Sequence, residues 1–82
     1  MREVSDLYLV ALLRLRGHRP TRVRGDGRRA VWVFAPTPEL EADLAGFYDG
    51  TLEVPARDFA EAVRSAKGEA VQLATVATVG AR

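Results

Sequence analysis

The sequence contains no cysteine, one histidine and one lysine. The absence of cysteine excludes disulfide bonds, thiolate nucleophiles and thiolate metal ligands. The single histidine, His18, would need carboxylates for every other ligand of a metal ion, and no acidic cluster lies near it in the sequence. We therefore expect no metal centre, no cofactor and no catalytic residue.

Other side chains with catalytic potential have ordinary structural explanations. Ser5 and Ser65 have no histidine near them in the sequence, and the acidic residues of 39–43 lie where a helix is expected to begin. The segment Gly25-Asp26-Gly27 lacks the strand-to-helix context and the glycine–lysine pattern of a phosphate-binding loop. These observations predict a protein that is not an enzyme and has no small-molecule substrate.

The sequence also lacks a long hydrophobic run. The apolar stretch of residues 7–15 has nine residues, whereas a membrane-spanning helix needs roughly 20. The chain begins with Glu3 and Asp6 instead of the positive start of a signal peptide, and no small-residue cleavage site follows. We expect a soluble, cytoplasmic protein with no membrane partner.

The net charge of +1 hides an asymmetry between the two halves. Residues 1–34 contain eight arginines and three acidic residues, a net charge of +5, and residues 35–82 contain four basic and eight acidic residues, a net charge of −4. A charge dipole of this kind can steer association with a partner without fixing the fold.

A chain of 82 residues has room for one small domain, and 48% hydrophobic residues argue against disorder. We predict a single domain over residues 1–70 and a C-terminal tail over residues 71–82. The tail repeats alanine, threonine and valine without clear periodicity. An edge strand, a helical extension and disorder all stay open for it.

The first predicted element is a helix that begins at the N-cap Ser5 and ends at Gly17. At 100° per residue, one face is expected to pack on the core and carries Leu7, Tyr8, Ala11, Leu12 and Leu15. Leu9, Val10 and Leu13 fall on the opposite side. This second apolar patch is either covered by the C-terminal segment or contacts another chain.

A β-hairpin is predicted next, because Thr21–Arg24 alternates with period two and Asp26-Gly27 favours a tight turn into Arg29–Phe34. A two-residue turn places Arg24 opposite Arg29. The core face of the hairpin then carries Val23, Ala30, Trp32 and Phe34. The other face carries Arg22, Arg24, Arg29, Val31 and Val33.

A second helix is expected to begin at the cap Thr37 and to end at Asp49-Gly50, with its buried stripe formed by Leu40, Leu44, Phe47 and Tyr48. Residues 51–54 are predicted to form a short strand, and residues 55–67 a third helix that ends at Gly68. The predicted fold class is therefore α+β, a single small domain of order αββαβα with a three-stranded, mainly antiparallel sheet packed with helices.

Three structural motifs resemble a family of small domains of unknown function from bacteria and phages. They are the helix end Gly17-His18, the strand Trp32-Val33-Phe34 and the stop Tyr48-Asp49-Gly50. The matching runs are residues 12–18, 26–34 and 40–48, followed by the strand of Leu52 and Val54. The resemblance covers about residues 5–68. It implies the αββαβα order and a setting in a phage or another mobile element, and it implies no activity.

The strongest functional feature is the density of arginine between residues 14 and 29, because the planar guanidinium group binds two phosphate oxygens at once. We predict a non-enzymatic accessory protein that contacts the nucleic-acid backbone through Arg19, Arg22, Arg24, Arg28, Arg29 and His18. The alternative is a protein-interaction module, either a homodimer or an inhibitor or adaptor of a larger protein. It would use the patch of Leu9, Val10 and Leu13.

Overall fold

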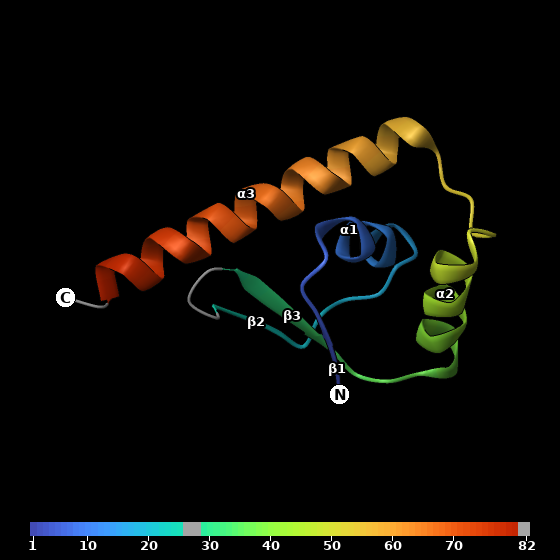
Figure 1. Ribbon diagram of the computed structural model, residues 1–82, viewed down its shortest axis with the longest axis horizontal. Helices are drawn as coiled ribbons and strands as arrows, with labels where there is room; N and C mark the ends of the chain where they lie inside the picture. The colour runs from blue at the N-terminus through green and yellow to red at the C-terminus, as the bar shows by residue number, and fades with distance from the viewer. Residues whose placement is uncertain (26–28, 81–82) are drawn as a thin grey trace.

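The computed structural model describes residues 1–25 and 29–80, with side chains described as far as residue 73. In this part of the chain the elements are β1 (Arg2–Val4), α1 (Leu7–Leu15), β2 (Arg22–Gly25), β3 (Ala30–Phe34), α2 (Pro38–Asp49) and α3 (Ala56–Gly80). The strands form an antiparallel sheet of order β1-β3-β2 (Figure 1). The predicted α+β class, with three helices and a three-stranded antiparallel sheet in the described residues, is confirmed.

The third strand of the sheet comes from a different segment than predicted. The N-terminal segment Arg2–Val4 pairs with β3, so that Arg2 lies opposite Phe34 and Val4 opposite Trp32. The predicted strand at residues 51–54 is wrong, since this segment is an irregular connection from α2 to α3. The N–H groups of Thr51 and Leu52 both donate to the carbonyl oxygen of Gly46, which holds the segment against the end of α2.

Gly46 is the residue of α2 that makes room for this connection. A Cβ atom added at Gly46 would lie 3.3 Å from the Cβ atom of Leu52, closer than an ordinary van der Waals contact. Leu52 and Val54 then pack against the edge of the core as half-buried residues. The apolar character of this segment is therefore used for packing against a helix and not for strand pairing.

The hairpin has the predicted faces in a different register. Val23 lies opposite Trp32 and Arg24 opposite Val31, two residues away from the predicted pairing, so that Arg24 and Arg29 do not face each other. Because side chains alternate along a strand, a shift of two residues leaves the side chains of β2 and β3 on their predicted faces. The predicted Asp26-Gly27 turn lies outside the described residues.

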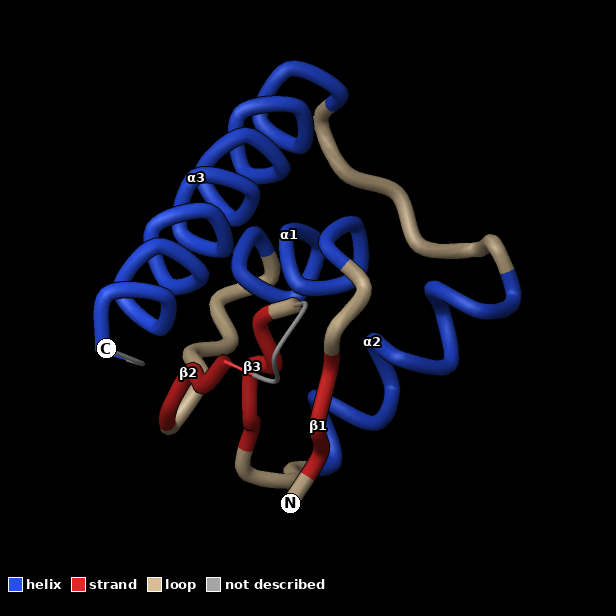
Figure 2. The backbone as a smooth tube through the Cα atoms, turned by 60° about the vertical axis from the view of Figure 1, so that its left-hand side comes forward, coloured by secondary structure: helices blue, strands red, loops and turns tan. Residues whose placement is uncertain are grey.

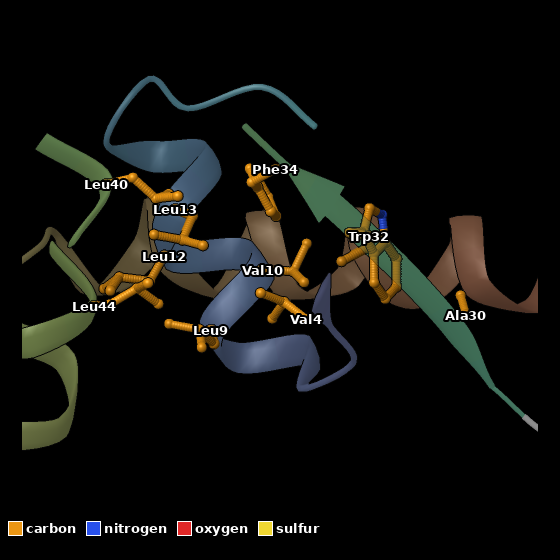
Figure 3. Close-up of a cluster of buried hydrophobic side chains, with 11 residues drawn as sticks. Val4, Leu9, Val10, Leu12, Leu13, Ala30, Trp32, Phe34, Leu40 and Leu44 are labelled. Carbon is orange, nitrogen blue, oxygen red and sulfur yellow. The ribbon is translucent and has the colours of Figure 1, made fainter. Parts of the chain in front are cut away.

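Helix α1 occupies the centre of the molecule. Figures 1 and 2 show α1 next to α3 and above the sheet, with α2 beyond its other side. Leu9, Val10 and Leu13 are only 3%, 0% and 0% exposed. Figure 3 shows Val10 of α1 close to Trp32 of β3 in the core.

These burial values correct two predictions about α1. Leu9, Val10 and Leu13 lie in the core and are not a surface patch available to a partner chain. Tyr8, expected to face the core, is 59% exposed, and its ring stacks on Phe59 of α3 with 6.4 Å between the ring centroids. A helix of nine residues is buried on both sides because the sheet and α3 cover different faces of it.

The ends of α1 and α2 follow local capping rules. Asp6, not the predicted Ser5, is the N-cap of α1, and its Oδ1 accepts hydrogen bonds from the backbone N–H groups of Tyr8 and Leu9. Thr37 caps α2 by accepting from the N–H of Leu40, and Gly50 ends α2 with φ of +74°. The predicted limits of α2 are confirmed.

The predicted stop of the third helix at Gly68 is wrong, because α3 continues to Gly80. Residues 71–80 of the predicted tail therefore form a helical extension. A helix of 25 residues is roughly 37 Å long, and it accounts for the molecule's longest dimension of 44 Å. Glu69, Ala70 and Leu73, which follow Gly68, contact the core. These contacts outweigh the cost of about 1 kcal/mol of a glycine inside a helix.

Glu69 joins three elements of the fold. Its Oε1 accepts a hydrogen bond of 2.8 Å from Nε1 of the fully buried Trp32, and its Oε2 accepts one of 2.7 Å from Nη2 of Arg14. Burial alone raises the pKa of Glu69, but the hydrogen bonds from Arg14 and Trp32 outweigh it and hold the pKa below its ordinary value. This carboxylate fixes α3 to both β3 and α1.

We predict that Glu69→Ala destabilises the protein by about 1–3 kcal/mol, because it leaves the indole N–H of Trp32 buried without a partner. Urea unfolding measures the loss. Glu61→Ala is the control, since Glu61 is an exposed acid on the same helix, and its effect should stay within about 0.5 kcal/mol. Equal losses in the two variants would contradict a special role of Glu69.

Candidate anion-binding surface

Several arginines of the basic half pair with the protein's own carboxylates. Arg14 pairs with Glu69 at 2.7 Å, Arg16 with Asp43 at 3.3 Å, and Arg24 with Glu3 at 3.0 Å. Arg2 forms two hydrogen bonds with Glu41, and the Nε–Oε2 distance is 2.8 Å. The carboxylate partners of Arg2, Arg14 and Arg16 all come from the acidic half, so much of the charge asymmetry of the sequence is neutralised inside the fold.

His18 has a structural partner as well. Its Nε2 lies 2.6 Å from Oδ2 of Asp43, the one buried charged residue in the described part of the chain. Burial raises the pKa of Asp43, but hydrogen bonds from His18 and Arg16 outweigh it and hold the pKa below the ordinary value of 3.8. Asp43 therefore ties α2 to the end of α1.

The face of the sheet opposite α1 carries Arg22 and Arg24 of β2, as predicted. The ion pair between Arg24 and Glu3 joins the two edge strands and therefore crosses the central strand β3. Beneath it, Val31 and Val33 are only 5% and 2% exposed. Arg24 thus shields apolar side chains and is only in part available to a ligand.

The predicted row of three arginines on this face is divided. Arg29 lines a hollow between β3 and α3, together with Lys67, on the helical side of the sheet. It does not join Arg22 and Arg24. Arg28 lies outside the described residues.

A basic hollow, as we name it, lies at the loop between α1 and β2. It has a volume of about 510 Å³ and is lined by Arg14, Gly17, His18, Arg19 and Pro20. Its lining contains three basic side chains and, among the described residues, no carboxylate. Gly17, with φ of +90°, turns the chain at the end of α1 so that the loop can form this surface.

Arg19 and Arg22 differ from the other basic residues of this region. Both are exposed, and neither forms an ion pair with any carboxylate in residues 1–25 and 29–80. Arg22 begins β2 directly after the loop. Thr21, between this loop and Arg22, is held in place because its N–H and Oγ1 both donate to the carbonyl oxygen of Val33. The two cations therefore lie on one short, fixed stretch of chain.

Sequence reasoning identified Arg19 and Arg22 but could not tell them from the arginines that are neutralised. Neutralisation depends on carboxylates 21 to 55 residues away in the sequence, such as Glu3 for Arg24 and Glu69 for Arg14. The partial signal was the excess of acid in the second half. The structure also brings Arg14 to the basic hollow, a residue that was not among the predicted site residues.

Comparison with known proteins adds no assignment. No family model matches the chain, and neither the curated proteins nor the solved structures contain a significant match. No group of three or more potential metal ligands forms within the described residues. None of the helices found there is long and apolar enough to cross a membrane.

We predict that acid weakens the fold through Asp43 and Glu69. Their pKa values in the folded protein lie below the ordinary values, so their stabilising effect is complete above the ordinary pKa and is lost as the pH falls through the folded pKa. Urea unfolding between about pH 6 and pH 3 measures this loss. Asp43→Asn should be less stable than the wild type near neutral pH and should show a shallower decline with acid. An unchanged slope would contradict the role of Asp43.

Proposed function

We propose that the protein is a small, non-enzymatic nucleic-acid-binding protein that contacts the phosphate backbone through Arg19 and Arg22, beside the basic hollow. One observation carries the proposal: these two exposed cations lack carboxylate partners in the described residues, whereas Arg14, Arg16 and Arg24 are matched by acids. An arginine without an internal partner has no neighbouring carboxylate to offset its charge, and its N–H donors are available for bidentate hydrogen bonds to a phosphate.

The other residues of the surface support this contact in different ways. Arg14 and His18 line the hollow next to Arg19, each held in place by its carboxylate. Arg24 follows Arg22 on the same face of β2 and forms an ion pair with Glu3. The surface is therefore small, and binding through two or three phosphate contacts should be weak and strongly dependent on salt.

The burial of the two aromatic residues of β3, next to the arginine-bearing strand, favours backbone contacts over stacking of bases on this hairpin. Trp32 and Phe34 are 0% and 1% exposed, so neither can serve as a stacking platform for a base. Phosphate contacts carry no sequence information by themselves. We therefore propose binding without sequence preference.

We predict that Arg19→Gln/Arg22→Gln weakens binding to all DNA and RNA sequences to a similar extent. Removing two phosphate contacts should reduce the slope of log K against log salt concentration by about 1.5–2. Fluorescence anisotropy with labelled DNA and RNA of several sequences, titrated from about 50 mM salt upward, measures both effects.

The matched control is Arg57→Gln/Arg64→Gln, which removes the same charge from exposed positions on α3. It should leave the salt slope close to that of the wild type. Two results would overturn the proposal: absence of binding by the wild type at about 50 mM salt, or equal weakening by both double variants, which would indicate a general charge effect. Weakening confined to one sequence would replace backbone contacts with base readout.

A further inference from the structure

A second hollow lies on the helical side of the sheet, between the start of α1, the start of β3 and the middle of α3. Its volume is about 310 Å³, at the lower end of the range of roughly 300–1,000 Å³ typical of small-molecule sites. Its apolar lining includes Leu7, Ala30, Trp32 and Ala70. We call it the tryptophan hollow. It has no part in the nucleic-acid contact proposed above.

Two cationic side chains line the tryptophan hollow. Arg29 precedes β3 and Lys67 lies on α3, and both are exposed. Neither forms an ion pair with a carboxylate in the described parts of the chain. The hydroxyl group of Ser5 adds a neutral hydrogen-bonding group to the lining.

Among the residues that the structure describes, the acids closest along the chain form other contacts, and Asp26 lies outside those residues. Asp6 caps α1 through the N–H groups of Tyr8 and Leu9 and lines a different hollow. Glu69 accepts its hydrogen bonds from Trp32 and Arg14 and lines a hollow next to β2. The described lining of the tryptophan hollow therefore combines apolar side chains with two positive charges and no negative one.

We propose that the tryptophan hollow binds a single-chain amphiphile with a carboxylate head, such as a medium-chain fatty acid. The alkyl chain contacts Leu7, Ala70 and Val71 in front of the fully buried Trp32, where it removes apolar surface from water. The carboxylate accepts charge-assisted hydrogen bonds from Arg29 and Lys67. The ligand is bound and not converted, since the lining offers no nucleophile with a neighbouring base.

Charge complementarity selects this class among apolar ligands. A neutral alcohol of the same length fills the same space but leaves both cations without a partner. A cationic amphiphile brings a third positive charge to the site and is repelled. The head group therefore decides the affinity order, with carboxylate first, alcohol second and ammonium last.

Trp32, the single tryptophan of the chain, is buried in the wall of the hollow, so its fluorescence reports on changes in that wall. Titration with decanoate below its micelle concentration should give a saturable change in emission. Decanol should bind at least tenfold more weakly, and decyltrimethylammonium should bind more weakly still. Isothermal calorimetry gives a second readout that does not depend on the indole.

Arg29→Gln/Lys67→Gln should weaken decanoate binding at least tenfold and leave decanol binding unchanged. The matched control Arg57→Gln/Arg64→Gln removes two charges from exposed positions outside the hollow and should bind decanoate like the wild type. Ala70→Leu should weaken both ligands by filling the hollow. All these variants are checked for folding by circular dichroism.

Four results would overturn the proposal. They are the absence of saturable binding in both fluorescence and calorimetry, binding only above the micelle concentration, equal affinities for decanoate and decanol, and an unchanged decanoate affinity in Arg29→Gln/Lys67→Gln. Because the tested residues exclude Arg19 and Arg22, failure here leaves the proposed nucleic-acid contact unaffected.

Discussion

The buried indole of Trp32 is the constraint on which the rest of the structure depends. A fully buried indole N–H needs a hydrogen-bond acceptor, and the acceptor here is the carboxylate of Glu69, 37 residues away. A partly buried carboxylate needs a cation in turn, and Arg14 supplies it. These linked requirements draw α3 across the sheet and against α1, so that α1 is buried on both sides.

The same constraint explains how the charges are distributed. In the described part of the chain, four of the eight arginines of the basic half pair with carboxylates contributed by other elements, namely Glu3, Glu41, Asp43 and Glu69. Arginine therefore serves first as a partner that lets acids and aromatic groups be buried or packed at the joints between elements. Arg19 and Arg22, and Arg29 with Lys67, remain as two separate sets of cations without such partners in the described residues. The first set lies at the loop after α1 and the start of β2, and the second at the hollow between β3 and α3.

The parts of the fold that could be predicted are those set by local rules. Alternation along β3 correctly predicted that Ala30, Trp32 and Phe34 face the core, because the side-chain period of a strand does not depend on its partner. Thr37 and Gly50 correctly predicted the limits of α2, because caps act over a few residues. The register of the hairpin, the strand Arg2–Val4 and the continuation of α3 past Gly68 were not predictable in this way. Each of them depends on packing between distant segments.

The candidate site likewise combines features set by local sequence with features set by packing between distant segments. By itself, the sequence determined which residues are cations, which strand positions alternate and which segments can form helices, since these are properties of side chains and of neighbouring residues. Only the tertiary structure decided that Leu9, Val10 and Leu13 are core and that His18 binds Asp43. It alone decided which arginines keep an unpaired charge. The physical reason is that burial and ion pairing depend on groups brought close in space, often from the other half of the chain.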